Sequence, residues 1–146
     1  MSQSKDSGIR GSYPEAVNAE QMQSIARHFL TEMQACVRSV DFHRARPLFA
    51  DDVVAFGTYA TVITGRDRLE REQWRNVWPN IRDFMFRLDE LTCLGGGDAI
   101  CVVVSWDSLG TRADGTTFER PGRATLLLVE RGGSWVAAHS HFSLAP

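Results

Sequence analysis

Two histidines near the end of the chain are the residues whose type and spacing best suit chemistry. They belong to the segment from Trp135 to Ser143, whose sequence is WVAAHSHFS. Side chains alternate between the two faces of a strand, so His139 and His141 should share one face with Trp135, Ala137 and Ser143. Imidazoles can transfer protons near neutral pH or bind a polar ligand. The alternative is a structural pair whose hydrogen bonds are satisfied by neighbouring strands or water.

A metal ion is another use for two histidines one residue apart, since they could be two of three ligands for zinc or iron. Asp107 is the one candidate for the third ligand. The sequence has no glycine-rich phosphate loop, because the glycines at 95–97 precede a strand and not a helix. It also has no G-x-S-x-G segment around a nucleophilic serine. Two histidines without a clear third ligand are weak evidence for a metal, so we predict no metal site. We also predict no organic cofactor.

Arg123 and Asp107 are charged residues on predicted strands. Arg123 begins a strand adjacent to the histidine strand, and a guanidinium in apolar surroundings needs a carboxylate or an anionic ligand. The two interpretations are a ligand anchor and a salt bridge to Asp107 or Glu119. Asp107 could orient a histidine or act as a base. It could equally be a solvated charge at the end of a strand.

Three aromatic residues are candidates for the wall of a ligand pocket. Trp74 and Trp78 are four residues apart and would share one face of a helix. Together with Tyr59 they could bind a planar or hydrophobic small molecule. The alternative is an ordinary core stripe, because aromatic side chains dominate most protein cores.

The elements that must position these residues are helices followed by strands. Asn18 should cap a first helix with Gln21 as its capping-box partner, and Asp41 should cap a short second helix. The sequence at 64–67 predicts a capping box for a third helix that extends to about Asn80. Apolar residues recur at helical spacing in the first helix: Met22, Ile25, Ala26, Phe29, Leu30, Met33 and Val37.

Strand patterns fill the rest of the chain. The segments 53–59 and 60–64 can pair as a hairpin, and from Phe84 onward apolar residues recur with a period of two. Longer strands are expected at 99–109, at 123–130 and at the histidine segment. The stretch 100–104 is apolar throughout, which predicts cover on both faces. Helices followed by long antiparallel strands indicate an α+β fold with the helices on one face of the sheet.

Composition limits the class of protein. A chain of 146 residues with a net charge of -2 fits one globular domain and gives no electrostatic case for nucleic acid. We expect a flexible tail at 1–16 and a single domain at 17–146. The N-terminal residues have no apolar segment, so we do not expect secretion, and the sequence has no apolar run of membrane-spanning length. The three cysteines have no metal-ligand spacing, which favours a cytoplasmic protein with free thiols.

The chain resembles the nuclear-transport-factor-2-like superfamily, and within it the polyketide-cyclase (SnoaL)-like and steroid-isomerase-like branch. The resemblance spans roughly 18–144 and depends on RPLFADD at 46–52, GRATL at 122–126 and the WVAAHSHFS ending. It implies a cone-shaped, cystatin-like α+β barrel, in which a curved antiparallel or mixed sheet wraps around a long N-terminal helix. It also implies a pocket at the wide end and a homodimer formed through the outer face of the sheet.

Residue matching to the steroid isomerases is poor at the two positions that matter. Their general-base aspartate falls on Gly57 here, and their oxyanion-hole tyrosine falls near Met33. Neither residue can transfer a proton or donate to an enolate, so that mechanism is not expected. The epoxide hydrolases of the superfamily need an Asp, Arg and Asp set, of which Arg123 and Asp107 supply two and no residue aligns with the third.

Two functional hypotheses follow. The first is a domain that binds a hydrophobic compound bearing a carbonyl or carboxylate, as an isomerase, lyase or cyclase that uses His139 or His141 as acid and base. The second is a non-catalytic association module that resembles the kinase association domain. Both predict a homodimer, and neither involves nucleic acid or a membrane.

Overall fold

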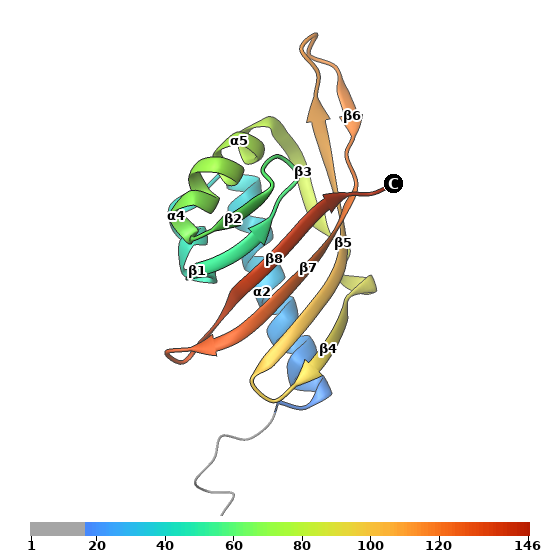
Figure 1. The fold of residues 1–146 in the computed structure, drawn as a ribbon. Helices are drawn as coiled ribbons and strands as arrows, with labels where there is room; N and C mark the ends of the chain where they lie inside the picture. The colour runs from blue at the N-terminus through green and yellow to red at the C-terminus, as the bar shows by residue number, and fades with distance from the viewer. Residues whose placement is uncertain (1–16) are drawn as a thin grey trace, which may run out of the picture.

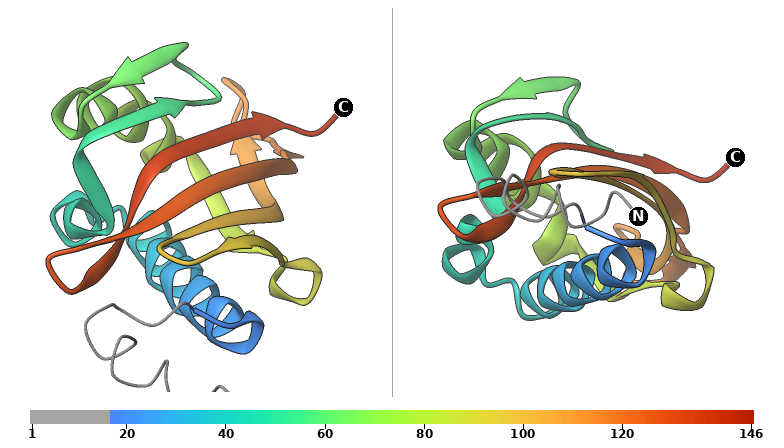
Figure 2. Two further views of the ribbon diagram at one scale, coloured as in Figure 1. Left: turned by 60° about the horizontal axis from the view of Figure 1, so that its bottom comes forward. Right: turned by 90° about the horizontal axis from the view of Figure 1, so that it is seen from below.

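The computed structural model describes residues 17–146, so the predicted tail at 1–16 lies outside the described residues. A curved sheet wraps around one long helix, and shorter helical segments close one side (Figures 1 and 2). The helical segments are α2 (Ala19–Ser39), α3 (Phe42–Ala45), η1 (Arg46–Leu48), α4 (Arg66–Leu69), η2 (Glu70–Trp74), α5 (Arg75–Val77), η3 (Trp78–Asn80) and η4 (Leu88–Glu90). No helix in this part of the chain is long and apolar enough to cross a membrane.

The strands form one eight-stranded mixed sheet. They are β1 (Phe49–Phe56), β2 (Val62–Thr64), β3 (Ile81–Phe86), β4 (Thr92–Gly96), β5 (Ala99–Thr111), β6 (Thr117–Glu119), β7 (Gly122–Arg131) and β8 (Ser134–Leu144). The order is β2-β1-β8-β7-β5-β3, and β4 and β6 also pair with the long strand β5. Only β1 and β8 pair in parallel among the paired strands at 49–144. The predicted α+β fold, a curved mixed sheet around a long N-terminal helix, is confirmed.

Helix α2 lies in the concave side of the sheet (Figure 2). The predicted capping box at its start is present, because the Asn18 side chain accepts from the Gln21 amide and Gln21 Oε1 accepts from the Asn18 amide. Its apolar stripe is buried against the sheet. Asp41 caps α3 as predicted by accepting from the amide of Arg44.

The third helical region differs from the prediction in its start and its regularity. It begins at Arg66, but Gly65 occupies the cap position and no side chain caps the helix. The segment Glu70–Trp74 is a π-helix, and its wider turn buries both Gln73 and Trp74. The irregular turn therefore contributes two side chains to the interior.

A β-bulge in β8 changes which residues share a face. Leu127 of β7 pairs with His139, whereas Leu128 pairs with Ala137, so Ala138 is an extra residue in the strand. Val136 and Ala137 are both buried, and His139 and His141 then lie on the opposite, outer face. The expectation that Ala137 shares a face with the histidines was wrong, because strict alternation does not continue through a bulge.

The outer, convex face of the sheet is partly apolar. In β5, Ile100, Val102 and Val104 point inward and are buried, whereas Val103 points outward and is 39% exposed. The prediction that 100–104 is covered on both faces therefore holds for the inner face of this chain. Val54 and Phe56 of β1 add to the convex surface beside the histidines.

Close packing at the start of β7 requires a glycine. A Cβ atom on Gly122 would lie 2.0 Å from Cζ2 of Trp106 and 2.5 Å from the carbonyl oxygen of Ser143. Trp106 is almost completely buried and cannot move away without disturbing the core. Only glycine lets the two strands approach here, because overpacking forces strained side chains or a shift of backbone.

We predict that Gly122→Ala lowers the free energy of unfolding by about 1–3 kcal/mol. Chemical denaturation followed by tryptophan fluorescence measures the change. Arg123→Ala is the matched control, because Arg123 is the next residue of the same strand and points to solvent. Equal stability of the two variants would contradict the packing argument.

Candidate functional site

A narrow cavity of about 40 Å³ lies inside the cone, between the sheet and the third helical region. This volume exceeds the space that one buried water needs. Its wall is mainly apolar, with polar groups from Thr58, Gln73, Trp106, Arg120 and Ser140. The remaining lining residues are Met33, Val37, Phe49, Phe56, Gly57, Leu69, Trp74, Val77, Trp78, Ile81, Phe84 and Phe142.

Arg120 is the one charged residue among those that line the cavity. It is half-buried, and its guanidinium lies 5.6 Å from the ring centre of Trp106. Burial lowers the pKa of Arg120 from its ordinary value, and no carboxylate at 17–146 forms an ion pair with it. A desolvated guanidinium normally has an anionic partner. Arg120 is therefore available to a ligand.

Thr58, in the loop that follows β1, accepts a hydrogen bond from Arg120, and Gln73 of η2 holds that loop. Arg120 Nη2 donates to Thr58 Oγ1 at 2.8 Å, and Gln73 Nε2 donates to the same oxygen at 3.1 Å. Gln73 Oε1 accepts from the amides of Tyr59 and Ala60 at 3.1 and 2.9 Å. Each of these two oxygens already accepts two hydrogen bonds. The groups near Arg120 that can still form hydrogen bonds are therefore donors.

Gly57 makes room for the buried amide of Gln73. A Cβ atom on Gly57 would lie 2.3 Å from Gln73 Cδ, so any side chain at 57 would displace the amide. The sequence resemblance matches this position to the general base of the steroid isomerases. Here a neutral carboxamide from the π-helix occupies the space, and its hydrogen bonds hold the loop in place.

Trp106 and Ser140 supply further polar atoms to the wall. The Trp106 indole N–H is buried and has no acceptor among the described residues. A buried, unpaired donor is uncommon and suggests an acceptor that the chain itself does not provide. Ser140 is buried in β8, and its hydroxyl makes no hydrogen bond to any residue at 17–146. Arg120, Trp106 and Ser140 therefore all retain unused donors.

Trp74 and Trp78, both predicted as pocket residues, do line the cavity. Their rings stack at 4.8 Å, and Phe42 stacks on the outer side of Trp78 at 5.4 Å. The Arg75 guanidinium covers the Phe42 ring at 4.5 Å. The aromatic wall is consequently the inner end of a continuous stack that reaches the surface.

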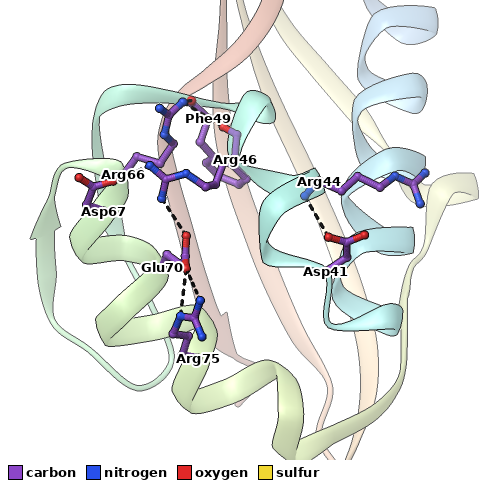
Figure 3. Close-up of polar contacts among 8 residues, drawn as sticks. All are labelled: Asp41, Arg44, Arg46, Phe49, Arg66, Asp67, Glu70 and Arg75. Atoms are coloured by element: carbon purple, nitrogen blue, oxygen red, sulfur yellow. Dashed lines mark hydrogen bonds and ion pairs between the residues drawn. The ribbon is translucent and has the colours of Figure 1, made fainter.

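An ion-pair cluster attaches this wall to the chain before β1 (Figure 3). Glu70 accepts from Arg46 at 2.7 Å and from Arg75 Nη2 at 2.6 Å, and Arg46 also pairs with Asp67. Arg66 donates to the carbonyl oxygens of Arg46 and Phe49. The hydrogen bond from Arg46 is the main reason that the pKa of Glu70 lies below its ordinary value of 4.5.

His139 and His141 lie outside the cavity, on the convex face. His139 Nδ1 is 2.7 Å from the carbonyl oxygen of Val54, which fixes Nδ1 as the donor. The Phe56 ring contacts both imidazoles edge-on, at 5.7 and 5.0 Å between ring centres. The structure thus brings the two histidines together as predicted. An acid–base role for them would require a substrate on the convex face.

Arg123 and Asp107 also lie on the outer side of the sheet. Arg123 is exposed, and its Nε is 3.4 Å from Ser143 Oγ. Asp107 does not pair with Arg123, because it forms a two-bond pair with Arg87 at 2.7 and 2.8 Å that holds the pKa of Asp107 below its ordinary value. The alternative that Asp107 pairs with Arg123 is therefore wrong.

Tyr59 is 67% exposed, at the mouth of the cone and not in the inner cavity. The part of the chain that the structure describes holds no group of three or more residues able to bind a metal. Burial raises the pKa of the Cys36 and Cys93 thiols, so these cysteines remain protonated.

Arg120 and Gln73 are the site residues that the sequence analysis missed. In β7 the inward side chains are Gly122, Ala124, Leu126 and Leu128, which all have even numbers. That alternation places Arg123 outside and indicates that Arg120, three residues earlier, points inward. Helical spacing with Leu69 and Val77 is compatible with an inner position for Gln73, but it does not distinguish Gln73 from its neighbour Trp74.

We predict that Glu70→Gln lowers the free energy of unfolding at neutral pH by about 1–3 kcal/mol, because Arg46 and Arg75 lose the carboxylate that they share. A lowered carboxyl pKa stabilises the fold above its ordinary value of 4.5, and this contribution is lost as pH falls through the lowered pKa. The difference in free energy of unfolding between the unmodified protein and the variant should therefore be constant above about pH 5 and become smaller below pH 4.5. Denaturation midpoints measured from pH 3 to 7 test this, and a deficit independent of pH would contradict it.

Comparison with known proteins supports the fold and defines the family. A model of the SnoaL-like domain matches residues 26–146. A search of curated proteins found no significant relative. Among solved structures, a ketosteroid isomerase-like protein from Erwinia carotovora atroseptica is 18% identical, with a TM-score of 0.73 and 86% of this chain and 98% of that chain covered.

Two further solved structures share the fold. A candidate calcium/calmodulin dependent protein kinase II association domain from Xanthomonas campestris is 21% identical, with a TM-score of 0.70 and 84% and 86% of the two chains covered. An NTF2-like protein of unknown function from Pseudomonas putida is 24% identical, with a TM-score of 0.68 and coverage of 88% and 89%. With its curved sheet around a long helix and the match over 26–146, the chain belongs to the SnoaL-like domain family.

Proposed function

We propose that the cavity binds a small organic compound with an apolar end and a carboxylate or carbonyl group, and that Arg120 anchors the oxygen. The observation that carries this proposal is a half-buried guanidinium in an aromatic wall with no carboxylate partner at 17–146. An anionic ligand would supply the missing charge and hydrogen bonds.

The chemistry of the remaining wall supports an acceptor ligand. The unpaired Trp106 N–H is a donor, and the oxygens of Thr58 and Gln73 are already occupied. A ligand offering only donors would leave the Trp106 N–H and the remaining N–H groups of Arg120 without an acceptor, at a cost of about 1–3 kcal/mol for each buried group. The stacked Trp74 and Trp78 rings would contact the apolar end.

No described residue that lines this cavity could act as a general base in catalysis. The described residues that line it include no aspartate, glutamate or histidine. An isomerase, lyase or cyclase reaction would therefore take its base from water or from the substrate itself. Ligand binding, with stabilisation of negative charge at Arg120, is the function that this wall supports best.

We predict that Arg120→Met weakens binding of 3-methylbutanoate by about 1.5–3 kcal/mol and leaves binding of 3-methylbutanamide nearly unchanged. The charged hydrogen bond is lost in the variant, whereas the apolar contacts stay. Isothermal titration calorimetry measures both affinities.

Arg123→Met is the matched control, because it removes the same charge from the convex face three residues away. It should leave both affinities as in the unmodified protein. A loss of carboxylate binding in Arg123→Met, with none in Arg120→Met, would reject the assignment of the anchor and favour a site on the convex face.

We also propose that two copies associate through the convex face, as an association module would. This face carries exposed apolar side chains at Val54, Phe56, Val62 and Val103, and they surround the histidine pair. An apolar sheet surface of this kind is typical of a protein–protein contact. The proposal is compatible with ligand binding, because the cavity lies on the other side of the sheet.

We predict a homodimer at micromolar concentration and a monomer of 16.3 kDa for Val103→Glu. The substitution would bury a charge in an apolar contact. Sedimentation velocity distinguishes the two states. Val40→Glu is the control, since Val40 has similar exposure but follows helix α2, away from the sheet face. A monomeric unmodified protein would refute the dimer.

A further inference from the structure

A second hollow lies at the mouth of the cone, next to the cavity. It has a volume of about 210 Å³, and Tyr59, Asn76, Asn80, Thr111 and Phe118 are among its lining residues. Thr58, Val77, Ile81 and Arg120 line both this vestibule and the inner cavity. Arg120 therefore stands at the boundary between a small apolar chamber and a larger, open one.

The two chambers differ in the hydrogen bonds that they can offer. Donors remain free on the inner side, at Arg120 and Trp106. In the vestibule, Asn76 Nδ2 donates to the carbonyl oxygen of Glu72 at 3.1 Å, and Asn80 Nδ2 donates to that of Asn76 at 2.9 Å. Neither Oδ1 accepts a hydrogen bond from any residue at 17–146. The vestibule therefore offers acceptors to a group that carries an N–H or O–H.

Size imposes a second restriction. The inner cavity of about 40 Å³ is much smaller than the vestibule of about 210 Å³, so the shorter apolar end of a ligand is the part that suits the inner cavity. The vestibule can take several more heavy atoms against the exposed faces of Tyr59 and Phe118. A ligand that occupies both chambers must therefore have, between its two ends, the group that contacts Arg120.

We propose that the vestibule is the outer half of the binding site, and that the ligand is a carboxylic acid substituted at the carbon next to the carboxylate. One substituent is a short apolar chain in the inner cavity. The carboxylate lies at Arg120, and the other substituent carries a hydrogen-bond donor to Asn76 or Asn80. This inference rests on the proposed function, because it assumes the same anchor.

A matched pair of compounds tests the vestibule directly. N-acetyl-L-valine is 3-methylbutanoate with an acetamido group on the carbon next to the carboxylate. We expect it to bind about five- to tenfold more tightly, the gain from one added hydrogen bond. N-acetyl-L-valinamide has the same extension without the charge and should bind more weakly than N-acetyl-L-valine.

The variant Asn80→Leu isolates the vestibule from the anchor. The side chain keeps its approximate size and loses the acceptor, so the advantage of N-acetyl-L-valine should fall while the affinity for 3-methylbutanoate stays the same. Asn76→Leu gives an independent second measurement at the other acceptor. Thermal unfolding of each variant shows whether the fold is retained.

The outcomes separate the two proposals. If neither acid binds to the unmodified protein, the proposed function fails and this inference fails with it. If 3-methylbutanoate binds and the acetamido group adds no affinity, the anchor stands and the vestibule proposal is overturned. An advantage of N-acetyl-L-valine that survives in both asparagine variants would also overturn the assigned contacts.

Discussion

The concave side of a strongly curved sheet has to be covered, and the way this chain covers it determines where a ligand can go. Helix α2 packs along the side formed by β3, β4 and β5, and the helical segments at 66–80 close the side of β1. Two covers that meet at an angle leave a gap, and large aromatic side chains fill most of it. The cavity is the part of the gap that Trp74, Trp78 and Phe142 do not fill.

Arg120 lines the space that the aromatic side chains leave unfilled. The guanidinium lies at the open end of an apolar space, so it loses hydration without gaining a carboxylate. Thr58 and Gln73 fix its position through neutral hydrogen bonds, which leave the positive charge uncompensated. Two exposed arginines, Arg87 and Arg131, have acidic partners, whereas the exposed Arg123 contacts Ser143 Oγ. The lack of a carboxylate matters at Arg120 because its guanidinium is half-buried, which supports a ligand-binding role.

The same fold can host different chemistry when one position changes. The sequence resemblance matches Gly57 to a carboxylate of the steroid isomerases, and here the amide of Gln73 lies where a side chain at 57 would begin. A neutral amide cannot abstract a proton, but it can fix a loop and orient Thr58 toward Arg120. The family membership thus defines the cone, whereas the residues in the wall define what it can bind.

Local sequence rules determined the elements of this protein, since helix caps, helical spacing and strand alternation depend on neighbours along the chain. They placed α2 with its capping box, the order of helices before strands, and Trp74 and Trp78 on an inner face. Tertiary structure alone decided the rest. The bulge at Ala138 turned His139 and His141 outward, and the π-helix turned Gln73 inward. Neither irregularity follows from the regular spacing of residues along a helix or strand. Alternation along β7 already separates Arg123 from the cavity, but the contact of Arg120 with Thr58 joins segments that are distant in sequence, and only the folded chain brings them together.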